Sequence, residues 1–160
     1  MPRLTTLYKE PASKFVAELM GDPKINMMEA QVLEIDKKVY VALSDNIKLE
    51  LPEKKQKKLE KYIGKEVYFG IRPEKIKIIN DKNNIGLFNA KIEKKIEKEN
   101  RNYYYFVIQN KEIVMETSID RKLEINKEPN LIFDLEYCHI FDKKTEENIT
   151  RNMDYIFYNE

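Results

Sequence analysis

The chain has 160 residues, with 29 Lys and Arg against 28 Asp and Glu, and a formal net charge of +1. This length is enough for one domain with a real core, and the near-neutral charge gives no long-range field that would attract nucleic acid or an anionic membrane. Cys138 is the only cysteine, which excludes an intrachain disulfide and a cysteine-rich zinc site. Because the sequence has neither a long apolar run nor a secretion signal, we expect a cytoplasmic protein.

The first 25 residues predict one short linking helix. Pro11 suits the first helical position, and Gly21 suits the left-handed residue just past the end. Phe15, Val16, Leu19 and Met20 form an apolar stripe between them. Residues 1–6 show no clear pattern. The helix should therefore pack on the domain that follows it.

From residue 26 the hydrophobic period changes to two, which indicates strands. Strands are expected around 28–35, 39–43 and 47–51, separated by turns at 36–38 and 44–46. The segment 52–63 begins with proline and ends at Gly64, so it predicts a second short helix. Its lysine run is best explained as a solvated face.

A strand ending in a rigid corner follows Gly64. Val67, Phe69 and Ile71 alternate with Glu66, Tyr68 and Gly70, the period of a half-buried strand. Pro73 stops the strand and keeps the preceding residue extended. We expect Gly70 to lie where side chains crowd, and Arg72 to pair with a carboxylate of Glu74 or Asp142.

The second half of the chain also predicts strands. Residues 80–84 form an evident loop, and we place a division between two half-units near 80–86. Strands are expected within 87–99, at 103–108, at 113–115 and over a long stretch at 131–137. The run at 103–108 is apolar on both faces, so Tyr104 and Phe106 are candidates for a dimer contact. Two short helices with eight or nine strands predict an all-β barrel or sandwich.

Three motifs follow one another along the chain. The first is L-Y-K-E-P-A-S-K-F-V-A-E-L-M-G-D-P-K-I-N, before residue 27. The second is G-x-x-V-x-x-G-I-R-P-E-x-I, which includes Gly64, Gly70, Ile71, Arg72, Pro73 and Glu74. The third lies C-terminal to Tyr137 and includes His139, Phe141, Asp142 and Thr145. Together they resemble the linking segment, the central signature and the closing strand of the C-terminal regulatory domain of ATP-binding subunits from maltose- and oligosaccharide-type ABC importers, a domain with the transport-associated OB (TOBE) fold.

Three segments depart from the family pattern, and one of them is 92–97, which lacks the glycine commonly seen there. Glu146 stands where glycine is usual in the final turn, which makes the turn geometry an open question. Residues 1–6 differ from the family's usual lead-in, so we expect the chain to begin at an artificial boundary.

The resemblance implies an OB-type (TOBE) β-barrel at 26–160, preceded by the linking helix at 1–25. It also implies a homodimer that contacts a nucleotide-binding domain, through it the membrane permease subunits, and in some relatives a sugar-uptake regulatory protein. Such a protein works at the inner face of the membrane. The transported solute cannot be identified from these residues.

Chemistry within the chain itself is not expected. No G-x-x-x-x-G-K-[ST] phosphate loop occurs, so we expect neither ATP binding nor hydrolysis. His139 is the only histidine, and a structural role at a strand end is the better interpretation than a general base. We predict no catalytic residue, cofactor or metal. The alternatives are an oxyanion-binding module of the OB type and an OB-fold nucleic-acid binder, which the charge balance disfavours.

Overall fold

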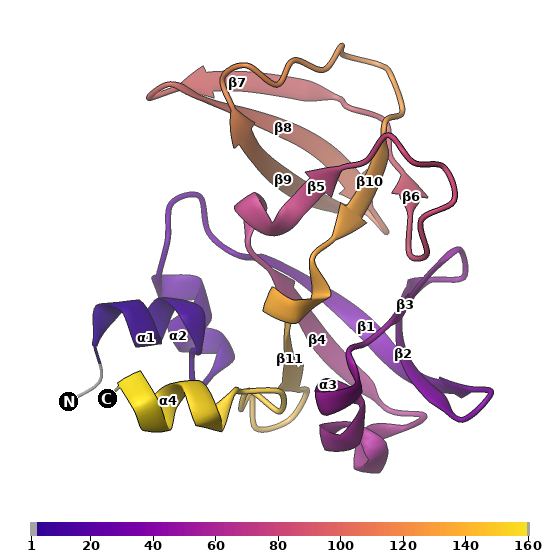
Figure 1. Cartoon of the computed structure of the whole chain (residues 1–160), viewed down its shortest axis with the longest axis vertical. Coiled ribbons are helices and arrows are strands. Elements are labelled where there is room, and N and C mark those ends of the chain that lie inside the picture. Colours follow the sequence, from indigo (N-terminus) through magenta and orange to yellow (C-terminus); the bar gives the residue numbers. More distant parts are fainter. Residues whose placement is uncertain (1–2, 160) are drawn as a thin grey trace.

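A computed structural model describes residues 3–159, and most of its ordered elements are strands in three antiparallel sheets (Figure 1). The largest sheet has the order β11-β4-β1-β2-β3. Its strands are β1 (Asn26–Ile35), β2 (Lys38–Ser44), β3 (Ile47–Glu50), β4 (Glu66–Ile71) and β11 (His139–Asp142). The mainly β fold of OB type that the sequence predicted is confirmed. Residues 1–2, on which part of the predicted boundary falls, lie outside the described residues.

Two smaller sheets pack above the large one (Figure 1). The first has the order β5-β10-β6 and the second the order β7-β8-β9. Their strands are β5 (Ile76–Ile78), β6 (Phe88–Asn89), β7 (Lys94–Lys98), β8 (Arg101–Ile108), β9 (Lys111–Ser118) and β10 (Asn130–Phe133). The predicted division near 80–86 falls in the connection between β5 and β6. Strands on both sides of it pair with each other, because β10 pairs with β5 and β11 pairs with β4.

The prediction of two short helices was wrong in number. Four short α-helices occur in residues 3–159, together with three 3-10 turns: α1 (Leu4–Lys9), α2 (Lys14–Leu19), α3 (Glu53–Lys58), α4 (Met153–Asn159), η1 (Glu60–Tyr62), η2 (Pro73–Lys75) and η3 (Leu135–Tyr137). No local pattern predicted α1, which is six residues long and is held by the tertiary contacts described below. For α4 a signal existed, because the Asn152 side chain accepts a hydrogen bond from the Tyr155 backbone N–H at 3.1 Å, as an N-cap does. No helix among the described residues is both long and apolar enough to cross a bilayer.

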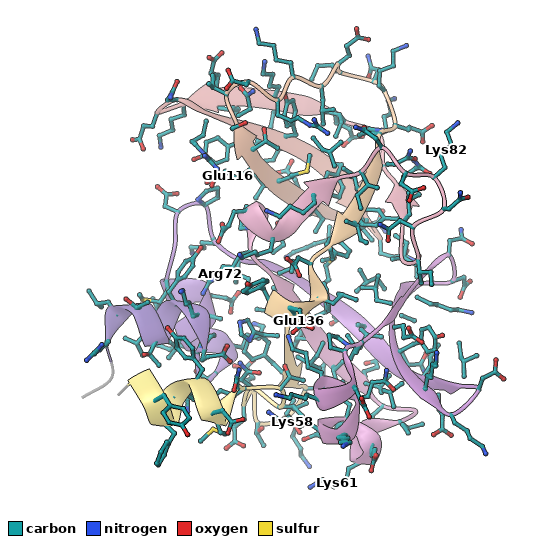
Figure 2. All side chains as sticks on the ribbon, in the orientation of Figure 1. Lys58, Lys61, Arg72, Lys82, Glu116 and Glu136 are labelled. Atoms are coloured by element: carbon teal, nitrogen blue, oxygen red, sulfur yellow. The ribbon has the colours of Figure 1, made fainter. Side chains whose placement is uncertain are left out.

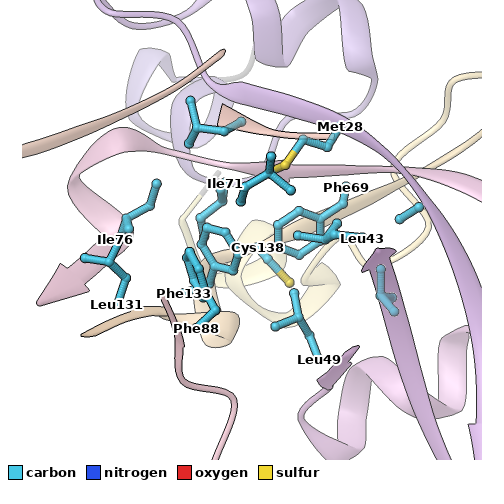
Figure 3. Packing of buried hydrophobic residues seen from close by; sticks show 14 of the residues in the cluster. Met28, Leu43, Leu49, Phe69, Ile71, Ile76, Phe88, Leu131, Phe133 and Cys138 are labelled. Carbon is cyan, nitrogen blue, oxygen red and sulfur yellow. The ribbon is translucent and has the colours of Figure 1, made fainter. Parts of the chain in front are cut away.

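One hydrophobic core joins the three sheets. Phe69 of β4 and Phe133 of β10 have ring centroids 5.5 Å apart, and Phe88 of β6 lies 4.6 Å from Phe133 on its other side (Figure 3). Ile71, predicted to face inward, is fully buried in the same cluster. Aromatic contacts at these spacings add to the energy of apolar burial.

The predicted long strand at 131–137 is interrupted, and the large sheet is open between its two edge strands. β10 ends at Phe133, and η3 turns the chain before β11 begins. Within residues 3–159 no ladder joins the edge strands β3 and β11. The ammonium group of Lys55 bridges this gap, because Nζ donates to the carbonyls of Leu135, Glu136 and Cys138 at 2.9, 2.9 and 2.6 Å.

Tyr104 and Phe106, expected at a dimer contact, are fully buried inside this chain. They sit on the inner face of β8, where burial alternates along the strand. Tyr104 is also fixed by its hydroxyl, which donates to the Arg121 carbonyl and accepts from the Leu123 N–H, both at 2.8 Å. The apolar run at 103–108 is therefore covered on one face by the domain itself, and only the other face remains available.

Candidate functional site: the seam between the N-terminal arm and the sheet

The residues of the family-like motifs meet along one seam, where the N-terminal arm (residues 4–20) lies against β4, η2 and β11. In Figure 2 Arg72 lies between the two arm helices and the upper sheets. Arg72 is the last residue before Pro73 and is extended, as the sequence predicted, with φ −69° and ψ 147°. Its side chain leaves the end of β4 and enters the arm.

Arg72 binds the arm through three backbone carbonyls. One guanidinium nitrogen donates to the carbonyls of Ala17 and Met20 at 2.9 and 2.7 Å, and the other donates to the carbonyl of Tyr8 at 3.0 Å. The first two carbonyls are at the C-terminal end of α2, where helix carbonyls lack intrahelical partners and favour a cation. Arg72 is 3% exposed, and burial lowers its pKa. The single cation thus satisfies the ends of both arm helices.

The prediction that Arg72 pairs with Glu74 or Asp142 was wrong. The Glu74 carboxylate accepts instead from the Tyr8 hydroxyl, and the Tyr8 ring lies 4.2 Å from the Arg72 guanidinium carbon. Burial and the Glu74 carboxylate raise the pKa of Tyr8, so this phenol stays protonated and donates. Tyr8 therefore stacks on the guanidinium while its hydroxyl reaches the turn that follows Pro73. Backbone carbonyls of the arm therefore bind the Arg72 guanidinium where a carboxylate was expected.

Gly21 allows this close approach. It has φ +96°, in the left-handed region expected just past a helix end. A Cβ there would lie 3.1 Å from the Tyr8 ring and 3.4 Å from the Arg72 guanidinium. The helix-ending role predicted for Gly21 is confirmed, and its lack of a side chain also leaves space for the stacked pair.

His139 forms a second attachment of the arm. It begins β11 and is 4% exposed. Its Nδ1 is 3.0 Å from the Asn148 side-chain nitrogen, and its ring also hydrogen-bonds the backbone of Lys9 in the arm. Burial, with smaller effects from Lys55 and Arg72, lowers the pKa of His139 to about 3. The imidazole is therefore neutral at pH 7, with Nδ1 accepting from Asn148 and the opposite nitrogen donating to the arm.

Asn148 extends this attachment with four further contacts. Its side chain donates to the Pro11 carbonyl at 2.8 Å, and its backbone N–H donates to the Ala12 carbonyl at 3.0 Å. Its side-chain oxygen accepts from the backbone N–H and the hydroxyl of Thr150, at 3.1 and 3.4 Å. Sequence reasoning missed Asn148 and Thr150, since neither lies in a recognisable local pattern. Asn148 bonds arm residues more than a hundred positions earlier in the chain, and Thr150 bonds Asn148 within the buried turn.

Asp142 organises the turn that carries Asn148 into place. Its carboxylate accepts from the backbone N–H groups of Lys144 and Thr145 at 2.8 Å each, and from the Tyr62 hydroxyl at 2.7 Å. These donors, the Thr145 amide first, lower the pKa of Asp142 to about 2. Glu146 has φ +64°, the conformation that glycine would adopt easily. The turn geometry left open by the sequence is therefore the left-handed one.

A small apolar cluster completes the seam beneath α2. Ala17, Ile25, Met27 and Phe141 are buried together, with Tyr68 packed beside them. Gly70 lies under this cluster, where a Cβ would be 3.0 Å from Ile25 Cδ1 and 3.1 Å from the Phe141 ring. The crowding predicted at Gly70 is confirmed. Gly64, in contrast, has φ +85° and open space around it, so it serves the turn into β4.

The seam holds the arm by polar contacts on one side while its other side is bare. Leu4, Phe15 and Leu19 are 74, 65 and 65% exposed, although Phe15 and Leu19 belong to the stripe that the sequence predicted to pack. No group of three His, Cys, Asp or Glu side chains that could hold a metal ion occurs among residues 3–159. The arrangement of the seam is therefore that of a rigidly attached arm that presents an apolar surface.

These features define a class of protein: an OB-type β-domain with a helical arm locked to its central corner. Residues 21–76 match the MalK OB fold domain family. Among solved structures, the cytoplasmic molybdate-binding protein ModG, with molybdate bound, superposes with a TM-score of 0.56 and 13% identity, over 72% of this chain and 94% of ModG. At that identity the likeness shows the fold alone.

Curated relatives are ATP-binding proteins of ABC transporters. The oligosaccharides import ATP-binding protein MsmX of Bacillus subtilis (strain 168) is 32% identical over 150 residues, which is 89% of this chain and 39% of MsmX. The uncharacterized ABC transporter ATP-binding protein YcjV of Escherichia coli O6:H1 is 30% identical over 144 residues, 88% of this chain and 38% of YcjV. The sn-glycerol-3-phosphate import ATP-binding protein UgpC of Chromobacterium violaceum is 24% identical, over 89% of this chain and 36% of UgpC.

Residues 21–76 thus form a MalK-type OB-fold domain, and over most of its length the chain is homologous to ABC transporter ATP-binding proteins. It spans about two fifths of the length of the curated relatives it matches.

Proposed function

We propose that this chain is the regulatory and dimerisation domain of the ATP-binding subunit of a sugar-type ABC importer. It acts through protein–protein contacts, in the cytoplasm at the inner face of the membrane. Its partners are a nucleotide-binding domain, the permease subunits reached through that domain, a second copy of itself, and in some systems a sugar-uptake regulatory protein. The observation that carries the proposal is an arm fixed by buried hydrogen bonds whose outer face is apolar and bare.

The arm's exposed face is the surface that would meet the nucleotide-binding domain. Phe15 and Leu19 are 65% exposed each, whereas Arg72 beneath them is 3% exposed. Exposed apolar groups gathered on a rigid support are characteristic of contact surfaces. The relatives MsmX and YcjV are more than twice as long as the stretch matched here, so they contain room for a further domain.

A chimera tests this contact. We expect that MsmX in which the matched segment is replaced by this chain assembles as one body, with the amides of α2 protected from hydrogen exchange. Phe15→Asp should remove that protection by placing a charge in the contact, while Ile85→Asp, at a loop residue 81% exposed, should not. Equal protection in the two variants would contradict an interdomain role for the arm.

Self-association would use the outward face of the β7-β8-β9 sheet, since the inner face is filled. Ile96 and Val107 are 41 and 44% exposed on that face. We expect a symmetric dimer with a dissociation constant of roughly micromolar, equivalent to about −8 kcal/mol. Sedimentation equilibrium should show Val107→Glu shifting the chain to monomer, while Ile63→Glu, at a residue 38% exposed elsewhere, should leave the dimer intact. A strict monomer at all concentrations would rule the dimer out.

Titration calorimetry distinguishes the proposal from its alternatives. We propose that the chain itself neither binds nor hydrolyses ATP, so Mg-ATP should give no saturable heat. The fold that it shares with ModG makes an oxyanion-binding module the second candidate. Saturable heat with molybdate would favour that candidate, and binding of single-stranded oligonucleotide would favour the nucleic-acid binder.

A further inference from the structure

The five-stranded sheet has a strand edge that no other strand within residues 3–159 occupies. β1 pairs with β4 along Asn26–Gln31 but with β2 only along Gln31–Ile35. Among the described residues, the β2 side of the first five residues of β1 has no ladder partner. Half of β1 therefore presents one side of its backbone to something other than a strand.

The alternation of backbone groups shows which residues present that side. The N–H and C=O of Val32 bond Lys65 and Gly64, on the β4 side, at 3.0 and 2.8 Å. Because these groups alternate in direction along a strand, Met28 and Ala30 also face β4. The N–H and C=O groups of Met27 and Glu29 accordingly point away from β4, to the unoccupied side.

A second open edge lies opposite. The side-chain amide of Asn26 both donates to the Val114 carbonyl and accepts from the Val114 N–H, each at 2.9 Å, as a strand residue would. Val114 of β9 therefore also points its backbone away from β8, and by alternation Glu112 does the same. Among the described residues, no ladder joins β1 and β9 beyond this contact.

A groove of about 380 Å³ lies between Met27–Glu29 of β1 and the turn from β8 to β9, which ends at Lys111. Met28 and Leu43 line it and belong to the core cluster, and Figure 3 shows both among the core side chains. Ile108, at the end of β8, adds a third apolar side chain. Methionine adapts its shape to different apolar groups, which suits a surface that receives a side chain from outside.

The outer rim of the groove is polar, and the charges on its arm side are paired, whereas Lys111 at the start of β9 adds a positive charge. Lys14 and Glu18 of the arm form an ion pair at 3.0 Å, and Glu29 pairs with Lys143 at 2.6 Å. A segment in the groove would thus meet apolar groups on its inner face and paired charges on the side of the arm.

We propose that this groove binds an extended segment of a partner protein, which adds a strand to β1. The backbone of Met27 and Glu29 supplies the hydrogen bonds, as in other cases of strand addition. The segment that fits has alternating side chains, apolar toward Leu43 and Ile108 and uncharged polar toward the arm. The proposal is independent of the regulatory function proposed above, because it depends only on the ladder and the groove.

The test first selects peptides that bind the chain and then removes one backbone hydrogen-bond donor from β1. Random peptides displayed on phage are panned against the immobilised full chain, and an enriched peptide is synthesised and titrated while backbone amide NMR follows the chain. We expect alternating apolar and polar residues in the peptide, and new exchange protection at Met27 and Glu29. Glu29→Pro removes an N–H that no strand uses in the free protein, so it is tolerated as proline is on a sheet edge. Glu29→Ala is the matched control, since it loses the same Lys143 ion pair but keeps the N–H.

Glu29→Pro should weaken the peptide roughly tenfold or more relative to Glu29→Ala, the loss of one hydrogen bond with its acceptor left unpaired. Equal affinity of the two variants, failure to enrich any peptide, or protection at a different surface would each overturn the proposal. Self-association of the wild-type chain that Glu29→Pro abolishes and Glu29→Ala keeps would make the occupant a second copy, and would overturn the assignment to a different protein.

Discussion

Arg72→Met should lower the free energy of unfolding by about 3 kcal/mol, because it leaves three carbonyls of the arm without the cation that binds them. The donors lost are those to Tyr8, Ala17 and Met20, at 2.7–3.0 Å. The Tyr8 ring also loses its stacking partner. Urea unfolding measures the loss, and hydrogen exchange should show the amides of α2 opening before the rest of the domain.

Arg72→Lys is the matched control for charge. A lysine keeps the positive charge but lacks the planar fork that reaches carbonyls on both helices, so we expect it to recover less than half of the loss. Full recovery by lysine would show that charge alone holds the arm. An unchanged urea midpoint in Arg72→Met would show that the seam contributes nothing to stability.

Acidification below pH 6.5 should destabilise the domain through the buried His139. His139 has a pKa of about 3 in the folded chain, against an ordinary value of 6.5. Between these two pH values the unfolded chain binds a proton on His139 and the folded chain does not. The contribution of His139 to stability therefore falls as the pH drops below 6.5, and it stops falling near pH 3. Once the unfolded imidazole is fully protonated, each further pH unit costs about 1.4 kcal/mol, so lowering the pH from 6.5 to 5 should cost about 1.6 kcal/mol.

His139→Gln isolates this contribution, because glutamine does not titrate and every other ionisable group is common to both proteins. The variant should be less stable at pH 7 yet lose little further stability between pH 6.5 and 5. Asp142 affects stability at lower pH than His139. Because its pKa is about 2, its contribution to the free energy of unfolding is present above pH 3.8 and is lost as the pH falls toward 2. Parallel pH profiles for wild type and His139→Gln, from urea melts at each pH, would refute the assignment.

Local sequence patterns determined the elements whose signals are themselves local. Strict alternation at 67–71 predicted β4, and Pro73 with Gly64 marked its two ends, because proline and glycine restrict or permit particular backbone angles whatever the surroundings. The crowding at Gly70 could also be anticipated, since a glycine inside a strand indicates a close approach. The family-like motifs identified the corner of Arg72 and the turn of Asp142 as structural positions.

The tertiary structure alone decided what those residues bind. Arg72 binds backbone carbonyls and not a carboxylate. The reason is that the arm, more than fifty residues earlier in the chain, brings the ends of two short helices to the end of β4. Helix α1 is too short to be stable alone, so its existence depends on that contact. The sequence of β8 is apolar on both faces, so Tyr104 and Phe106 could be expected at a dimer contact. In the structure burial alternates along β8, so the face that carries these two residues is buried and the opposite face is exposed. The open edge of β1 had no sequence signal, since a strand's pattern records which side chains are buried and not which backbone groups find a neighbour.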